Sequence, residues 1–191
     1  MVLRSAFVRK PAMAAVACVG ALVLVLPATA SAGNGGVGST DAPPPPVKGS
    51  KAKLMPSGEA RAPKNAPQEV VDAIAAANSI DDAGYCTGGG HGRWRSDCYD
   101  CSGAVSYVLG PKGAGILKTP EDSRTFARWG EKGKGTWITV FTNPGHAYAV
   151  IAGLRFDTSI PDDGQEGPGW SKDAKAGLVN GPFQKRHFLG L

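Results

Sequence analysis

The stretch from residue 136 to residue 159 carries three strand patterns joined by very short connections. The segment "TWITVF" (136–141) is β-branched and aromatic, and "HAYAVIAG" (146–153) and "RFDTS" (155–159) follow it almost immediately. Runs of this kind, separated only by turn-forming residues, are typical of adjacent antiparallel strands. Because helical patterns come first in the chain and strands second, we predict an α+β fold, with N-terminal helices packed on a small antiparallel sheet.

Helical spacing of apolar residues marks three segments before these strands. The first helix is expected to start at Pro67, a residue type favoured at the beginning of helices, and to stop by Gly84. The second covers "SGAVSYVL" (102–109), whose alanine, valine and leucine residues share one face. The third covers 119–130, where Thr119 is the expected cap.

The first 32 residues have the pattern of a secretory signal peptide. Three basic residues lie in the first ten positions, an uncharged apolar run follows (12–26), and small residues end the segment. The run is shorter than the roughly 20 apolar residues that span a bilayer. We therefore predict export, with cleavage after Ala32 or, as the alternative, after Ala30, and no stable membrane insertion afterwards.

Residues 33–66 are rich in glycine, proline, serine and lysine and contain almost no large apolar side chain. Such a segment buries too little surface to offset its ordering entropy, so we predict a disordered linker before a folded domain at 67–191. The net charge is +5: the signal peptide, called the leader below, carries +3, the linker carries +3, and residues 67–191 carry −1. A folded domain this close to neutral gives no reason to expect nucleic acid as a partner.

The segment "DCYDCSGAV" (97–105) holds two of the three cysteines that remain after the leader. In an oxidising compartment an odd number of cysteines leaves one thiol free. One interpretation is a Cys-x-x-Cys redox pair, although no strand–helix–strand unit surrounds it. Another is a zinc site, although the spacing of its ligands differs from the common zinc patterns. The members of that zinc site would be Cys86, His91, Cys98 and Cys101.

A third interpretation separates the two neighbouring cysteines. Cys101 lies at the start of the second helix, where the helix dipole and free N–H groups favour a thiolate nucleophile. A thiolate needs a proton shuttle and an orienting group, and His146, with Asp157 on the next strand, supplies both. Cys86 and Cys98 then remain to form a disulfide around a glycine-rich loop. The plainer alternative is three structural cysteines and a core histidine.

The motif "DCSG" (100–103) opens a predicted helix, and "GH" (145–146) opens a predicted strand. This pair of motifs resembles the NlpC/P60 family of cell-wall cysteine peptidases, and the chain looks like a secreted actinobacterial branch of it. The resemblance covers residues 67–191 and implies a papain-like α+β core. It also implies that Cys101 is the nucleophile and His146 the base.

The same resemblance implies further residues of the site. Asp157 takes the third catalytic position, with Thr158 as the alternative. Tyr85 corresponds to a tyrosine that lies near the substrate in that family. The oxyanion of the reaction is expected to be met by the backbone N–H of Cys101 or of Ser102 at the helix start.

The resemblance implies a secreted or cell-wall-associated cysteine peptidase that hydrolyses an amide bond in the stem peptide of peptidoglycan. A thiol acyltransferase or amidase on the same scaffold is the enzymatic alternative, because the acyl-enzyme is shared and only the acceptor differs. A catalytically inactive wall-binding protein is the other alternative. We expect a monomer that uses neither a metal nor a cofactor and has peptidoglycan as its partner.

Overall fold

The computed structural model describes residues 45–160, 166–174 and 181–191, which all belong to one compact unit. The predicted leader and residues 33–44 of the predicted linker lie outside them. The described helices are α1 (Gln68–Asn78), α2 (Cys101–Leu109) and α3 (Ser123–Phe126). The described strands are β1 (Lys53–Leu54), β2 (Ala60–Arg61), β3 (Gly84–Tyr85), β4 (Cys98–Tyr99), β5 (Glu131–Lys132), β6 (Ile138–Asn143), β7 (His146–Ile151), β8 (Leu154–Asp157), β9 (Gly169–Ser171) and β10 (Gln184–His187). Within these residues no helix has the length and apolar character needed to cross a bilayer.

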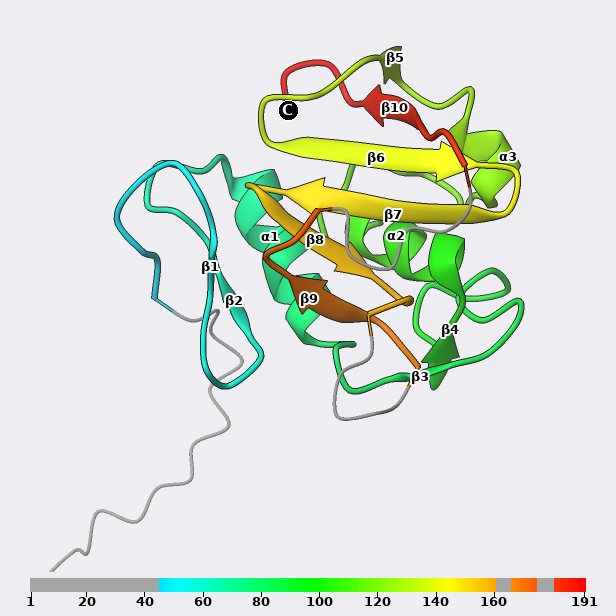
Figure 1. Ribbon diagram of the computed structural model, residues 1–191, viewed down its shortest axis with the longest axis horizontal. Coiled ribbons are helices and arrows are strands. Elements are labelled where there is room, and N and C mark those ends of the chain that lie inside the picture. Colours follow the sequence, from blue (N-terminus) through cyan, green and yellow to red (C-terminus); the bar gives the residue numbers. More distant parts are fainter. Residues whose placement is uncertain (1–44, 161–165, 175–180) are drawn as a thin grey trace, which may run out of the picture. The chain divides into compact units, whose positions relative to one another are not determined.

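Six strands form one antiparallel sheet in the order β5-β10-β6-β7-β8-β9. Helices α1 and α2 pack against each other and against β7, on one face of this sheet (Figure 1). Alternate residues of β7, namely Ala147, Ala149 and Ile151, are fully buried toward that core together with Phe156 of β8. The helices and the antiparallel sheet confirm the α+β class that the sequence predicts.

Two tight turns set the register of β6, β7 and β8. Between β6 and β7, the Asn143 side chain accepts a hydrogen bond from the N–H of Gly145 at 2.9 Å, and Asn143 pairs with His146. Between β7 and β8, Ala152 and Gly153 both have positive φ, 46° and 89°, as the two-residue turns that match strand twist require. The start of β7 therefore lies beside the end of β8.

Helix α3 is shorter than the sequence predicts and has a different cap. Asp122 caps it, and the Asp122 carboxylate accepts a hydrogen bond from the N–H of Thr125 at 2.7 Å. Thr119 is not the cap, because the backbone of Glu121 is held outside the helix. The Ser106 hydroxyl donates to the Glu121 carbonyl at 3.1 Å and accepts from the Glu121 N–H at 2.9 Å.

The chain before α1 is ordered from residue 45 onward, contrary to the prediction of a disordered linker to residue 66. Strands β1 and β2 pair with Leu54 opposite Ala60, and Ala60 and Ala62 are buried. Asn78, which ends α1 before the predicted stop, accepts a hydrogen bond from the N–H of Ala60 at 3.0 Å and donates one to its carbonyl at 2.9 Å. The composition argument failed because small alanines and backbone bonds, rather than large apolar side chains, fix this hairpin.

Candidate active site

Cys101 is the first residue of α2 and carries a free, partly buried thiol. Asp100 caps the helix, and its carboxylate accepts a hydrogen bond from the N–H of Gly103 at 2.7 Å. The N–H groups of a first helical turn have no acceptor within the helix, so those of Cys101 and Ser102 are available to an anion. Cys101 therefore lies at the helix N-terminus, as the sequence interpretation requires.

The imidazole of His146 lies between Cys101 and Asp157. Its Nε2 is 2.8 Å from Oδ1 of Asp157, the last residue of β8. The side chain of Cys101 lies close enough to the same ring to raise its pKa. The structure thus brings together three residues from α2, β7 and β8, and Asp157 rather than Thr158 contacts the imidazole.

The protonation of His146 follows from its two partners. Burial lowers the pKa of His146, but the hydrogen bonds and charges of Asp157 and Cys101 outweigh burial and raise it to about 9. Burial raises the pKa of Asp157, yet His146 and Arg155 hold it below its ordinary value. Because the pKa of His146 is higher in the fold than in the unfolded chain, its stabilisation is complete below about pH 6.5 and is lost as the pH rises through about 9.

We expect the imidazole of His146 to titrate with a midpoint near pH 9 in an NMR experiment. In Cys101→Ala the midpoint should fall, because one of the two raising partners is removed, but it should stay above the ordinary value of 6.5, because Asp157 remains. The His146 resonance is identified as the one that is absent from the spectrum of His146→Gln. A midpoint at or below the ordinary value in the wild-type protein would show that the two partners do not outweigh burial.

Arg155 and Ser159 complete the surroundings of Asp157, and the sequence analysis missed both. Oδ2 of Asp157 accepts hydrogen bonds from the Arg155 guanidinium and, at 3.1 Å, from the Ser159 hydroxyl. Oδ1 accepts a bond from the N–H of Ser159 at 3.1 Å in addition to its contact with His146. The segment "RFDTS" places Arg155 and Asp157 on the same strand face, because residues two apart on a strand share a face, but it does not indicate that Arg155 is buried.

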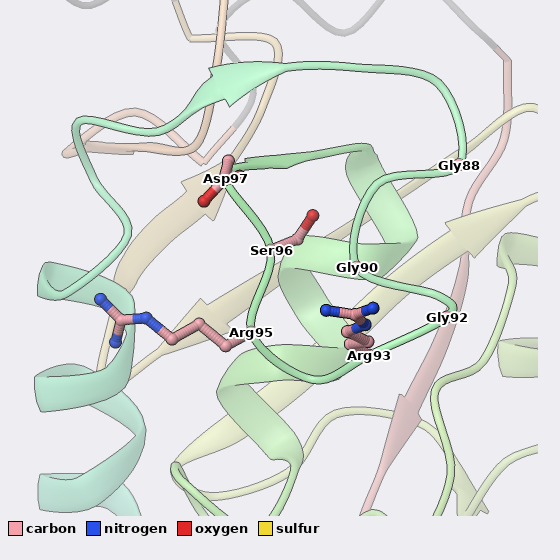
Figure 2. Close-up of a pocket in the computed structure, with 7 residues that line it drawn as sticks. All are labelled: Gly88, Gly90, Gly92, Arg93, Arg95, Ser96 and Asp97. Carbon is pink, nitrogen blue, oxygen red and sulfur yellow. The ribbon is translucent and has the colours of Figure 1, made fainter. Parts of the chain in front are cut away.

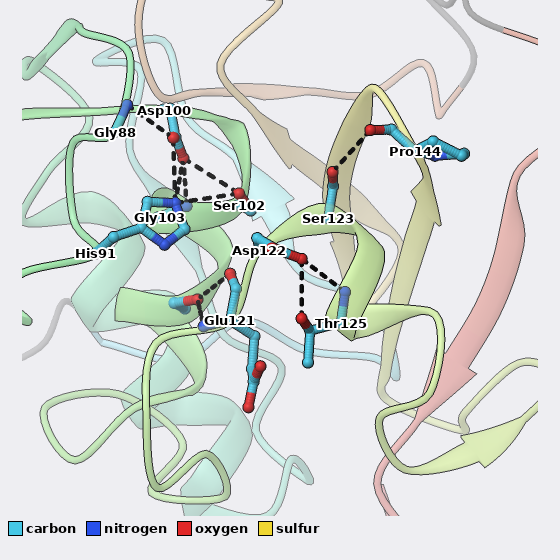
Figure 3. A network of polar contacts seen from close by, with 11 residues as sticks. Gly88, His91, Asp100, Ser102, Gly103, Glu121, Asp122, Ser123, Thr125 and Pro144 are labelled. Carbon is cyan, nitrogen blue, oxygen red and sulfur yellow. Dashed lines mark hydrogen bonds and ion pairs between the residues drawn. The ribbon is translucent and has the colours of Figure 1, made fainter.

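A second network fixes the loop that precedes α2 (Figure 3). The Asp100 carboxylate lies 2.9 Å from Nε2 of His91 and accepts a hydrogen bond from the N–H of Gly88 at 3.0 Å. The Ser102 hydroxyl donates to the same carboxylate at 3.2 Å and lies 3.2 Å from Nε2 of His91. The side chain of Ser102 is therefore engaged in this network, and its backbone N–H remains for the expected oxyanion role.

The turn before His146 is fixed by α3, as Figure 3 also shows. The Ser123 hydroxyl donates to the carbonyl of Pro144 at 3.3 Å. The Thr142 hydroxyl donates to the carbonyl of Ser123. These two bonds join the end of β6 and the turn that follows it to α3. The position of the His146 imidazole therefore depends on α3 as well as on the hairpin.

Glycine at position 103 is required by the close packing of the preceding loop on α2. A Cβ at Gly103 would overlap the carbonyl oxygen of Gly89 and touch Gly90. We expect Gly103→Ala to lower the free energy of unfolding by about 1–3 kcal/mol, despite the higher helix propensity of alanine, because the backbone must shift. Thermal unfolding followed by circular dichroism tests this. In the matched control Gly92→Ala, the new Cβ meets no atom within 4 Å, and an equal melting temperature for both variants would contradict the argument.

The structure confirms the predicted disulfide between Cys86 and Cys98, whose Cα atoms lie 5.5 Å apart. Cys101 is the free cysteine of the described residues. This pairing contradicts the zinc interpretation, which needs both bonded sulfurs as ligands, and the Cys-x-x-Cys redox pair. Within the described ranges, no group of three or more histidine, cysteine or acidic residues is placed to hold a metal ion.

Tyr85 and a cavity both belong to the part of the chain that precedes α2. Tyr85 is 43% exposed. Burial raises the pKa of its hydroxyl, and the charges of Cys101 and Asp100 raise it further. The cavity, of about 320 Å³, lies along the disulfide loop, and Arg93 and Arg95 contribute to its lining (Figure 2).

Fold and site together define an α+β protein with a cysteine, a histidine and an aspartate in contact at a helix N-terminus. No model of a known protein family matches the chain, and no curated protein matches it. Among solved structures, the chain is similar to that of Rv1477, a hypothetical invasion protein of Mycobacterium tuberculosis. The identity is 21%, the TM-score is 0.44, and the alignment covers 71% of this chain and 70% of that chain.

Proposed function

We propose that this chain is a secreted cysteine peptidase of the NlpC/P60 type, with a papain-like core, that hydrolyses an amide bond in peptidoglycan stem peptides. The observation that carries the proposal is the chain of contacts from Cys101 through His146 to Asp157, with the sulfur at the start of α2. A helix N-terminus, an imidazole and a carboxylate are what an activated thiolate requires. The "DCSG" and "GH" motifs support the family part of the proposal.

In the proposed reaction, the thiolate of Cys101 attacks the amide carbonyl carbon, and backbone N–H groups at the helix start hold the oxyanion. The intermediate collapses as His146 gives its proton to the leaving amine, and a thioester remains. Water then gives a proton to His146 and attacks the thioester, which releases the carboxylic acid product and the thiolate. Asp157 keeps the imidazole in one orientation through both steps.

Cellular location and substrate are supported by features outside the three contacting residues. A cell-wall substrate requires export, which the basic and apolar leader predicts. The Cys86–Cys98 disulfide fits an oxidising compartment. Arg93 and Arg95, which line the cavity beside α2, have the guanidinium geometry that suits the carboxylates of a stem peptide.

Digestion of defined muropeptides tests the proposal. The mature chain is incubated with purified disaccharide-peptides, and the products are identified by mass spectrometry. We expect two fragments whose summed mass exceeds that of the substrate by one water. The same preparation treated with iodoacetamide should be inactive, because Cys101 is the free thiol of the described chain.

The rival functions give different products in the same experiment. An acyltransferase joins the acyl fragment to an added amine acceptor in place of water. An inactive wall-binding protein leaves every muropeptide intact but sediments with insoluble peptidoglycan. Either result overturns the proposed hydrolysis.

A further inference from the structure

We infer that Arg155 is a positioning residue of this site, whose buried guanidinium holds Asp157 in the orientation and charge state that anchor His146. Arg155 lies two residues before Asp157 on β8, so both side chains project from the same face of the sheet. Both side chains are completely buried. Of the two measurements described below, only the turnover of muropeptides depends on the proposed function.

The two carboxylate oxygens of Asp157 have separate partners. Oδ1 lies 2.8 Å from the imidazole of His146. Oδ2 accepts a hydrogen bond from Nε of Arg155 at 2.9 Å and another from Nη2. Nη2 also donates to the Ser159 hydroxyl at 3.0 Å, and that hydroxyl donates to Oδ2 at 3.1 Å. Rotation of the carboxylate would break these contacts, so the guanidinium fixes the direction in which Oδ1 faces the imidazole.

An aromatic layer in turn holds the guanidinium. Cζ of Arg155 lies 4.6 Å from the centroid of the Tyr148 ring. That ring stacks on Phe141 at 4.7 Å and meets Phe183 edge-on at 5.2 Å. A cation over a desolvated ring is stabilised by the ring quadrupole. The planar fork of an arginine can make this stack and both carboxylate bonds together, whereas a lysine ammonium cannot.

The charge balance of the site explains why a buried arginine is needed. The carboxylate of Asp157 and a thiolate at Cys101 are two anions, and the imidazolium of His146 balances one of them. Arg155 supplies the second cation. Among the described residues, Tyr148 on β7 is the other titratable group nearby: burial raises its pKa, Arg155 lowers it and Asp157 raises it, and β9 contributes a glycine opposite Asp157.

Loss of the Arg155 cation should raise the pKa of Asp157. Burial raises the pKa of Asp157, and His146 and Arg155 together bring it below its ordinary value. Without the guanidinium, the carboxylate takes up a proton at higher pH, and a neutral acid does not hold the imidazolium. The imidazolium then gives less support to the thiolate of Cys101 in acid.

Arg155→Gln and Arg155→Lys separate the charge from the hydrogen-bond donors. Alkylation of Cys101 by iodoacetamide is followed by mass spectrometry across the acid and neutral range, and this measurement needs no substrate. For Arg155→Gln we expect the acid limb of the rate profile to move to higher pH by about one unit or more. Arg155→Lys keeps the charge and should stay near the wild-type profile. The matched control is Arg186→Gln, which removes a buried arginine on β10.

Turnover of muropeptides gives a second measurement. We expect Arg155→Lys to lower kcat about tenfold at unchanged KM, because a single ammonium cannot fix the carboxylate. If the Arg155→Gln profile coincides with the wild-type profile, or if Arg155→Lys shifts as far as Arg155→Gln, the inference is overturned. If the expected alkylation shift occurs without any muropeptide cleavage, the inference holds and the proposed function fails.

If Arg155→Gln does not fold, a variant that lacks both buried charges, those of Arg155 and Asp157, tests the inference instead. Arg155→Gln combined with Asp157→Asn removes the buried Arg155–Asp157 ion pair as a whole, so this double variant is expected to fold. Its Cys101 should lose reactivity in acid, because the imidazolium has no carboxylate partner. A folded double variant with wild-type alkylation would overturn the inference.

Discussion

Cys101→Ala is expected to reduce kcat for muropeptide cleavage on the order of 10⁴-fold or more. Alanine offers no nucleophile, and the other two cysteines of the described chain are bound in a disulfide. The contact of 2.8 Å between His146 and Asp157 does not involve the thiol, so the rest of the site should keep its geometry. Single-turnover cleavage, followed by mass spectrometry at saturating substrate, measures the loss.

Cys101→Ser is the matched control for this substitution. Serine keeps the size and hydrogen-bonding capacity of the side chain but not the ionisable sulfur, so cleavage should again be lost while muropeptide binding is retained. Thermal unfolding of both variants should match that of the parent. Cleavage by Cys101→Ala at a rate comparable to the parent would exclude the thiol as the nucleophile.

The three contacting residues were accessible to sequence analysis because each lies at the boundary of an element. Cys101 begins α2, His146 begins β7 and Asp157 ends β8. Such boundaries are marked locally by a capping aspartate and by short turns, and these signals need no knowledge of distant contacts. The strand patterns then place the end of β8 beside the start of β7.

The features that the sequence did not reveal depend on contacts between distant segments. An arginine on a strand is normally exposed, so nothing in "RFDTS" indicates that Arg155 is buried under Tyr148. The hairpin of β1 and β2 is fixed by hydrogen bonds between the Asn78 side chain and the backbone of Ala60, eighteen positions away. The composition of the segment does not indicate these bonds. The cap of α3 was misplaced for the same reason, because Ser106 holds the chain from another helix.

Removal of the Cys86–Cys98 disulfide is expected to lower the free energy of unfolding by about 3 kcal/mol. The bridge joins residues 12 positions apart, and its main effect is to restrict the unfolded chain. The variant of choice is Cys86→Ala combined with Cys98→Ala, because a single substitution leaves a second free thiol close to Cys101. Urea unfolding followed by tryptophan fluorescence measures the change.

The chemistry of Cys101 should survive this loss, because other contacts position the helix start. Asp100 still binds the preceding loop through the N–H of Gly88 and the imidazole of His91, whereas the partners of the sulfur come from β7 and β8. Alkylation of Cys101 should therefore keep its pH dependence, while KM for muropeptides rises as the loop loosens. A double variant as stable as the parent would contradict the loop-closure argument. A folded variant with an unreactive Cys101 would show that the disulfide, rather than the Asp100 network, positions the nucleophile.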